Sequence, residues 1–116
     1  MQKWIAGLTA LTLSTSLFAA NTYLIETIIS KNKQVIDSPA LISPVGQAGV
    51  AEAKKGKYNY ELLVEVAGEK DGIATVYTNL TVNGKFHKQK AKVPLKEKVW
   101  LNMGDVRLNV RVIPYQ

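Results

Sequence analysis

The chain has 116 residues and a formal net charge of +6, with 15 Lys and Arg against 9 Asp and Glu, and it contains no cysteine. This length suits one domain with one core. The lack of cysteine excludes disulfides, a lipid-bearing cysteine, and thiolate metal ligands or nucleophiles.

The first twenty residues have the three-part layout of a secretory signal peptide. Lys3 is followed by an uncharged stretch from Trp4 to Ala20 that ends in small residues. A membrane anchor is the alternative, but a spanning helix needs about 20 predominantly apolar residues, and this stretch is shorter and diluted by Thr and Ser. We therefore expect cleavage after Ala19 or Ala20, with Ala19 preferred. The product is then periplasmic or secreted from a bacterial cell, without a stable membrane span.

The expected mature chain remains basic. Removal of residues 1–20 takes away Lys3 and leaves 14 Lys and Arg against 9 Asp and Glu, a net charge of +5. This charge suits anionic partners outside the cytoplasm, such as lipid headgroups, acidic glycans or an acidic protein face. Solubility and protection of strand edges explain it equally well. Nucleic acid is not expected as a partner, because export separates the chain from it and the basic residues are not interleaved with aromatics.

Residues 21–116 are expected to form a single all-β domain. Short β-branched runs alternate with turn residues, which is typical of antiparallel sheets. Longer strands are expected at 22–30, 58–67, 73–82, 85–93 and 106–113, and shorter ones at 33–37, 40–42, 48–53 and 98–103. This spacing predicts a small antiparallel β-sandwich or a partly open barrel of about seven to nine short strands.

Alternation of side chains assigns a face to each residue of the longer strands. Tyr23, Ile25, Thr27 and Ile29 share one face, and so do Tyr58, Tyr60, Leu62, Val64 and Val66. In the last strand Val106, Leu108, Val110 and Val112 are expected to face the core, with Arg107, Asn109 and Arg111 outside. A turn is expected at 68–72, and the flanking prolines place residues 40–42 at a sheet edge or a strand start.

Asn83-Gly84 predicts a two-residue type I′ hairpin between 73–82 and 85–93, because both central residues of this turn need φ > 0. The loop length sets the register: Val82 opposes Lys85, Leu80 opposes His87 and Val76 opposes Ala91. On the same face, Thr78 meets Gln89 and Ala74 meets Val93. On the other face Thr81 meets Phe86, Asn79 meets Lys88, Tyr77 meets Lys90 and Thr75 meets Lys92. The first face is the more apolar, so we expect it to point into the core and the lysines to lie outside with Tyr77.

The stretch DSPALISPVGQA at 37–48 has a Ser-Pro and an apolar strand ahead of a Gly-Gln-Ala turn. It resembles a part of the β-domain of bacterial secretins, and the likeness extends over residues 32–104. The same order continues with Leu62–Val66, Asp71-Gly72 and a following strand, and Lys96–Leu101 before Gly104. No ring-building domains precede this region and no membrane-inserting lip is evident. The resemblance therefore implies a free-standing domain of similar plan, and pore formation does not carry over.

The sequence offers no catalytic constellation, so we expect neither an enzyme nor a metal or cofactor site. His87 is the one histidine, and its neighbours Lys85 and Lys88 provide no carboxylate to orient it. We therefore interpret it as an ordinary histidine that faces solvent. Glu69 and Asp71 are the closest acidic pair in sequence, and their expected place is a solvated turn.

The candidate binding surface consists of Lys85, Phe86, Lys88, Lys90 and Lys92. Phe86 and the last three lysines share one strand face, about 6.6–7 Å apart. Such a row suits an anionic lipid or glycan, or an acidic protein strip. Lysines on an edge strand also prevent edge-to-edge aggregation. Aromatic residues, which either stack on sugars or fill the core, are Tyr58, Tyr60, Tyr77 and Trp100.

Two functional hypotheses follow. The first is a non-catalytic periplasmic module that binds another cell-envelope protein, by strand addition at the proline-flanked edge. The second is a small inhibitor or sequestering protein that meets a hydrolase or an anionic envelope polymer through the lysine row.

Overall fold

The computed structural model describes residues 21–115, and within them all regular structure is β. The strands are β1 (Thr22–Lys31), β2 (Gln34–Asp37), β3 (Ala40–Pro44), β4 (Ala48–Lys55), β5 (Tyr58–Lys70), β6 (Ile73–Val82), β7 (Lys85–Pro94), β8 (Val99–Met103) and β9 (Val106–Tyr115). The predicted signal peptide lies outside the described residues. Within those residues, no helix has the length and apolarity that crossing a membrane requires.

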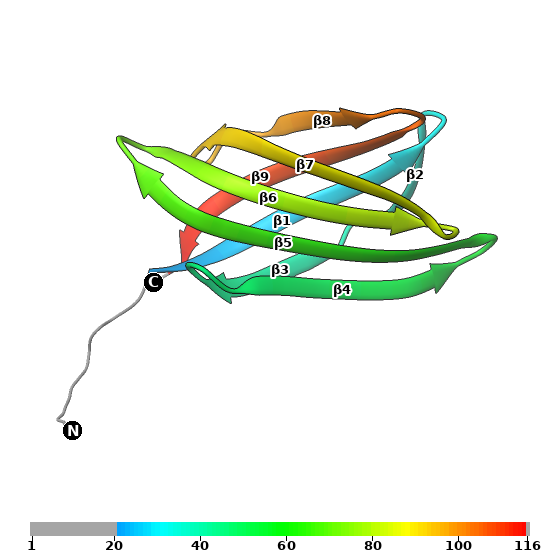
Figure 1. The fold of residues 1–116 in the computed structure, drawn as a ribbon, viewed down its shortest axis with the longest axis horizontal. Helices are drawn as coiled ribbons and strands as arrows, with labels where there is room; N and C mark the ends of the chain where they lie inside the picture. Colours follow the sequence, from blue (N-terminus) through cyan, green and yellow to red (C-terminus); the bar gives the residue numbers. More distant parts are fainter. Residues whose placement is uncertain (1–20, 116) are drawn as a thin grey trace, which may run out of the picture.

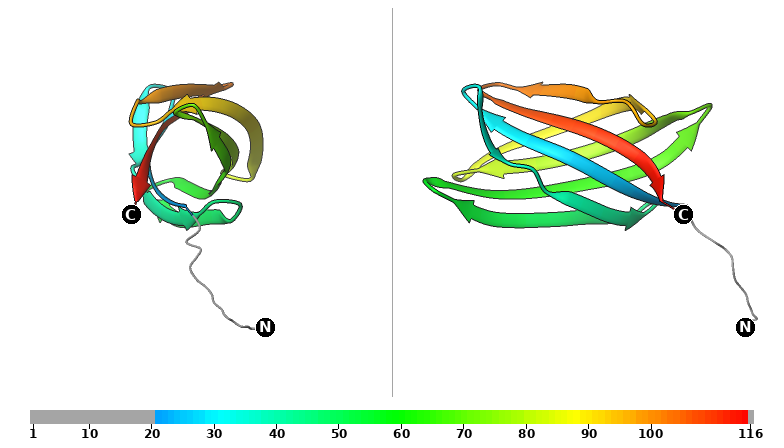
Figure 2. Two further views of the ribbon diagram at one scale, coloured as in Figure 1. Left: turned by 90° about the vertical axis from the view of Figure 1, so that its left-hand side faces the viewer. Right: turned by 180° about the vertical axis from the view of Figure 1, so that it is seen from behind.

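The strands form two antiparallel sheets that curve around a common core, which confirms the predicted all-β class of a small sandwich or partly open barrel (Figures 1 and 2). Sheet A has the order β2-β1-β9-β8, and β3 continues the line of β2 along β1. Sheet B is the meander β4-β5-β6-β7. The chain crosses from sheet A to sheet B after β3 and returns after β7. The proline-flanked segment lies at the edge of sheet A, as its prolines predict.

The core lies between the sheets and consists of the predicted alternating faces. Side chains from β1, β5, β6 and β9 are its main part, and most are less than 2% exposed. Its members include Tyr23, Ile25, Ile29, Tyr60, Leu62, Val64, Val66, Ala74, Val76, Leu80, Val82, Val106, Leu108, Val110 and Val112. Asn109 is the exception to the predicted pattern. It lies on the outer side of β9 yet is only 2% exposed, because Ile28 and Trp100 flank it on the two neighbouring strands.

The β6–β7 hairpin has the predicted register at every pair, from Val82 opposite Lys85 to Ala74 opposite Val93. Asn83 and Gly84 have φ values of 49° and 82°, as a type I′ turn requires. The Asn83 side chain adds to the turn, because its Oδ1 accepts the backbone N–H of Asn59 at 2.8 Å. This contact ties the hairpin tip to the start of β5.

The turn predicted at 68–72 is shorter in the structure than expected. β5 continues to Lys70, and only Asp71 and Gly72 form the turn, with φ values of 54° and 78°. A bulge between Val66 and Gly68 inserts one extra residue into β5. The insertion changes which side chains face inward, so that Glu69 lies opposite Ala74 on the inner side.

The two sheets meet without a backbone ladder where β3 lies beside β4 and where β7 lies beside β8. At both seams, the places where the two sheets meet, backbone hydrogen bonds from turn residues join the sheets. The N–H of Gly46 donates to the carbonyl of Val66, and the N–H of Lys96 donates to that of Val112, each at 2.8 Å. At the first seam the backbones approach closely, since a Cβ on Gly49 would lie 3.1 Å from the Cβ of Leu41.

Two tyrosine–carboxylate hydrogen bonds join the sheets at opposite ends of β5. Tyr23 of sheet A donates to Glu69 Oε1 at 2.8 Å, and Tyr60 of sheet B donates to Asp37 Oδ2 at 2.6 Å. Burial, together with the hydrogen bond to Glu69, raises the pKa of Tyr23 to about 12. Burial also raises the pKa of Tyr60 above its usual range.

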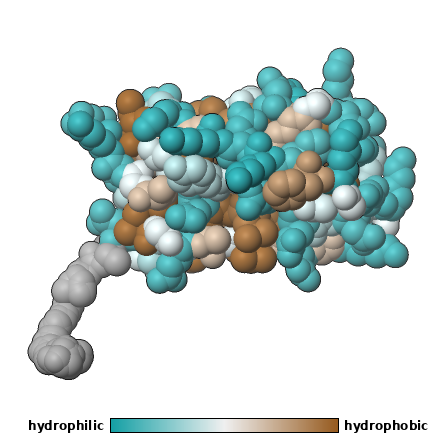
Figure 3. All heavy atoms as spheres, viewed as in Figure 1, coloured by the Kyte–Doolittle hydropathy of each residue, from teal (hydrophilic) through white to brown (hydrophobic). Residues whose placement is uncertain are grey.

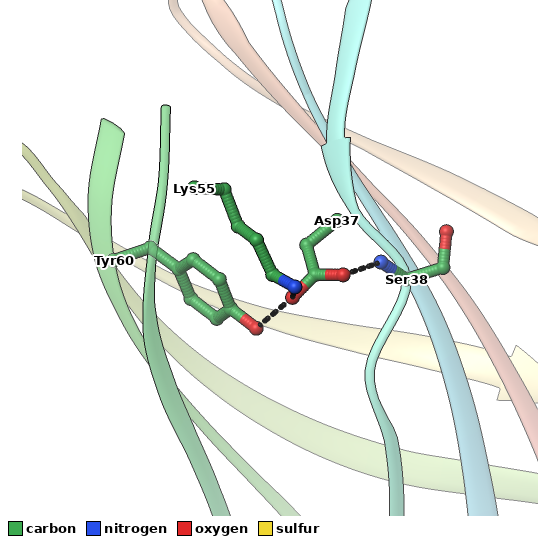
Figure 4. A network of polar contacts seen from close by, with 4 residues as sticks. All are labelled: Asp37, Ser38, Lys55 and Tyr60. Atoms are coloured by element: carbon green, nitrogen blue, oxygen red, sulfur yellow. Dashed lines mark hydrogen bonds and ion pairs between the residues drawn. The ribbon is translucent and has the colours of Figure 1, made fainter. Parts of the chain in front are cut away.

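The Asp37 carboxylate has three partners (Figure 4). Besides the Tyr60 hydroxyl, it accepts the N–H of Ser38 at 2.9 Å and has Lys55 Nζ at 4.0 Å. The hydrogen bond from Tyr60 is the largest cause that lowers the pKa of Asp37. This network connects the end of β2 with β4 and β5.

Candidate functional site

The predicted lysine row lies on the outer face of sheet B, along its edge strand β7. Lys88, Lys90 and Lys92 are exposed, and Phe86 is 59% exposed at the end of the row. The alternating burial of β7 places these four side chains on the side away from the core. The structure therefore brings Phe86 and three of the four candidate lysines together on one face.

Contacts with β6 hold part of the row in place. The Nζ of Lys90 lies 5.6 Å from the centre of the Tyr77 ring, and the Nζ of Lys92 donates to Thr75 Oγ1 at 2.8 Å. Lys88 lies opposite Asn79. The row is thus a partly ordered strip of positive charge beside Tyr77, whose side chain is 40% exposed.

Lys85 is separate from this row. It is an odd-numbered residue of β7, opposite Val82, and so points to the other side of the strand. Its charge acts on Asp105, whose carboxylate accepts a hydrogen bond from Lys31 Nζ at 3.0 Å. The hydrogen bond from Lys31 is the main cause that lowers the pKa of Asp105, and Lys85 adds to it. Lys85 therefore belongs with the turn between β8 and β9.

Sequence reasoning missed an acidic strip on the same face. Glu52 of β4 and Glu61 and Glu65 of β5 occupy outward positions, and Glu52 pairs directly with Glu61. The ion pairs of the described residues join other side chains, so these glutamates are not neutralised by the lysine row. Period-two alternation could have placed each glutamate outside, but not on the same sheet as β7.

Apolar side chains lie on the same face, within the charged strips and between them. Val50 is 54% exposed and pairs with Leu63, which is half-buried on β5. With Tyr77 and Phe86 they form the apolar part of this face. Figure 3, which views the molecule from the side of sheet B, shows separate apolar patches among hydrophilic residues. We call the outward residues of β4, β5, β6 and β7 the sheet B face.

His87 faces the interior, so its interpretation as a solvent-facing residue is wrong. It is half-buried opposite Leu80, and its Cε1 lies against the turn at Gly104. Its Nε2 is buried without a hydrogen-bond partner among the described residues. A buried polar atom in this position destabilises the fold, because it loses its hydrogen bonds to water on folding and makes none within the protein.

We expect His87→Leu to raise the free energy of unfolding by about 1 kcal/mol, because it removes the unpartnered nitrogen and keeps the apolar contacts. Urea unfolding at pH 7 measures the change. His87→Gln keeps polar atoms at the same place and should not raise the free energy of unfolding. A leucine variant less stable than the parent would show that Nε2 has a partner in solution.

The aromatic candidates do not form one platform. Tyr60 is in the core, whereas Tyr77 lies on the sheet B face and Trp100 on the outer face of sheet A. The guanidinium carbon of Arg107 lies 4.2 Å from the centre of the Trp100 ring, which covers one side of the indole. Sugar stacking on a shared aromatic surface is therefore not supported.

A shallow cavity of about 280 Å³ lies on the outer face of sheet A, at the break between β2 and β3. Its lining includes Pro39, Asn109 and the ion pair between Arg111 and Glu26, whose atoms are 3.3 Å apart. Among the described residues, no group of three or more His, Asp or Glu side chains is placed to hold a metal ion. We assign no chemistry to this cavity.

The proline-flanked edge is less open than strand addition requires. β4 lies against β3, with Gly49 over Leu41 and Ser43. The remaining part of the edge, β2, has only four residues. A partner strand at β3 would have to displace β4 first.

Neither a model of a known protein family, nor a curated protein, nor a solved structure matches this chain. The resemblance to the secretin β-domain stays a hypothesis that rests on residues 32–104.

Proposed function

We propose that the chain is an exported, non-catalytic binding module that contacts another protein of the cell envelope through the sheet B face. The observation that supports this most is the composition of the face. It combines a partly ordered lysine row, an acidic strip and exposed apolar side chains on the same four strands. Faces on which exposed apolar side chains lie among polar and charged ones are typical of protein interfaces.

The glutamates distinguish a protein partner from an anionic polymer. Lys88, Lys90 and Lys92 alone would suit an acidic glycan or lipid headgroup, as the second hypothesis from the sequence requires. An extended polyanion that covered this face would also meet Glu61 and Glu65, about two strand spacings or 10 Å away from the row. Like charges at that distance oppose binding. A protein surface with charges of both signs avoids this repulsion.

The test is capture of partners from an envelope extract by the tagged mature chain under crosslinking. We expect a second protein to be retained, and the triple variant Lys88→Gln, Lys90→Gln and Lys92→Gln to lose it. The matched control is Lys33→Gln with Lys98→Gln, two exposed lysines outside the sheet B face, which should retain it. Binding by the parent should also weaken as salt is added.

Three results would contradict the proposal: recovery of the chain with no partner, unchanged capture by the triple variant, or equal loss in the control. Capture of purified acidic glycan that is abolished by the triple variant, with no protein retained, would favour the polymer instead.

A further inference from the structure

We infer that the protein partner of the sheet B face is a second copy of this chain, packed face to face about a twofold axis that runs parallel to the strands. This inference rests on the proposed function and names the partner of the same surface.

The distribution of charge across the sheet carries the inference. The half of the face on β4 and β5 has Glu52, Glu61 and Glu65 near its middle and two lysines, Lys54 and Lys70, near opposite ends of the sheet. In contrast, β7 presents only lysines as charged outward residues. Neighbouring strands are about 4.8 Å apart, so about 14 Å separates β4 from β7. The face therefore has an acidic side and a basic side, and each is the complement of the other.

This distribution of charge favours one orientation of the twofold axis over the other. A twofold axis along the strands, between β5 and β6, exchanges the two sides of the sheet and places β7 of one copy over β4 of the other. Lys88 then lies over Val50 of the partner copy, next to Glu52. Lys90 lies over Ala48 of that copy, next to Glu65. The same contacts occur twice by symmetry. An axis perpendicular to the strands would instead place lysine over lysine and glutamate over glutamate, which repel.

The middle of the face supplies the apolar contact. Leu63 of β5 and Tyr77 of β6 lie nearest the proposed axis, and the exposed Val50 and Phe86 lie further out on β4 and β7. An axis along the strands keeps each position along them, so Phe86 of one copy lies over Glu52 of the other, one position along β4 from Val50, which is 54% exposed. The Phe86 and Val50 side chains would lose water that they contact in the monomer, which favours association.

The area of the sheet B face limits the affinity of the dimer. Four strands of about eight residues each cover about 20 Å by 25 Å, or about 500 Å² per copy. Two such faces bury about 1,000 Å², the lower limit for a specific interface. We therefore expect a dimer that forms at roughly 10 µM to 1 mM and that weakens with salt.

Purified protein alone tests the inference, by sedimentation over roughly 10 µM to 1 mM. We expect the parent to dimerise and two charge-inverted variants to be monomeric. One is Lys88→Glu with Lys90→Glu, which makes the face acidic, and the other is Glu61→Lys with Glu65→Lys, which makes it basic. An equimolar mixture of the two should recover a dimer with one copy of each. The control Lys33→Glu with Lys98→Glu should dimerise like the parent.

A second measurement does not depend on charge. The chain has no cysteine, so a single Asn79→Cys places one thiol on β6 close to the proposed axis. A short bis-maleimide should join two copies of this variant, whereas Val35→Cys on the exposed part of sheet A should remain unlinked.

The inference is overturned if the parent stays monomeric throughout, if both charge-inverted variants dimerise, or if their mixture stays monomeric. A monomeric parent that still captures a different envelope protein through its lysines overturns the second copy and leaves the proposed function standing. A monomeric parent that captures nothing overturns both.

Discussion

Replacing Asp37 by alanine is expected to lower the free energy of unfolding at pH 7 by about 2 kcal/mol, since a buried donor that loses its acceptor costs about 1–3 kcal/mol. The Tyr60 side chain is 6% exposed, and its hydroxyl donates to Asp37 at 2.6 Å. Alanine removes that acceptor and also the partner of the Ser38 N–H. Urea unfolding of the parent and the variant measures the difference.

The hydrogen bond between Tyr60 and Asp37 also predicts that the free energy of unfolding depends on pH. The pKa of Asp37 is lower in the folded chain than in the unfolded one, chiefly because of the hydrogen bond from Tyr60. A lowered pKa stabilises the fold above the unfolded value of about 3.9, and this stability is lost as the pH falls toward the folded pKa. The pKa of Tyr60 is raised, so its contribution is present below about 10 and is lost as the pH rises further.

Asp37→Asn isolates the charge, because its amide oxygen still accepts a hydrogen bond but does not titrate. We expect this variant to lose less stability at pH 7 than the alanine variant, and its unfolding free energy to fall less steeply below pH of about 4. Glu97→Gln, at an exposed residue, should keep the acid dependence of the parent. Equal slopes for the parent and Asp37→Asn would show that Asp37 is not the group responsible.

Local sequence signals predicted the parts of the fold that local chemistry decides. Asn83-Gly84 set the β6–β7 register because a two-residue loop allows only one pairing. Alternation assigned the faces of β1, β6 and most of β5, since a one-residue slip would expose the whole core face. For the same reason, Phe86, Lys88, Lys90 and Lys92 lie on one surface as predicted.

Contacts between distant segments could not be predicted in this way. The bulge near Gly68 breaks the alternation of β5, and only the pairing with β6 reveals it. The hydrogen bond between Tyr60 and Asp37 depends on which sheet each strand joins. His87 was assigned to solvent from its lysine neighbours in sequence, although the predicted hairpin register already placed it opposite Leu80 on the core face, where it lies against the turn at Gly104. The acidic strip was missed although the turn expected at 68–72 joins 58–67 to 73–82, because a turn of that length does not set which residues of the two strands are opposite each other.

Gly84→Val is expected to lower the free energy of unfolding by about 1–2 kcal/mol or more. Gly84 has φ 82°, and a left-handed backbone costs an L-residue about 1–2 kcal/mol, with a further penalty for a β-branched side chain. The strain falls on the turn that aligns Leu80 and Val82 with β7, so relief by opening the turn would disturb the register. Urea unfolding at pH 7 measures the loss.

The matched control is Gly68→Val, because it makes the same chemical change in the same sheet. Gly68 is outside the left-handed region, and a Cβ there would meet no atom within 4 Å. The β5 backbone at this position accepts a β-branched residue, so we expect a change of less than about 0.5 kcal/mol. The difference between the two valine variants then measures backbone strain at Gly84 alone. If Gly84→Val is as stable as Gly68→Val, the type I′ turn does not hold in solution, and the register that places the lysine row outside loses its support.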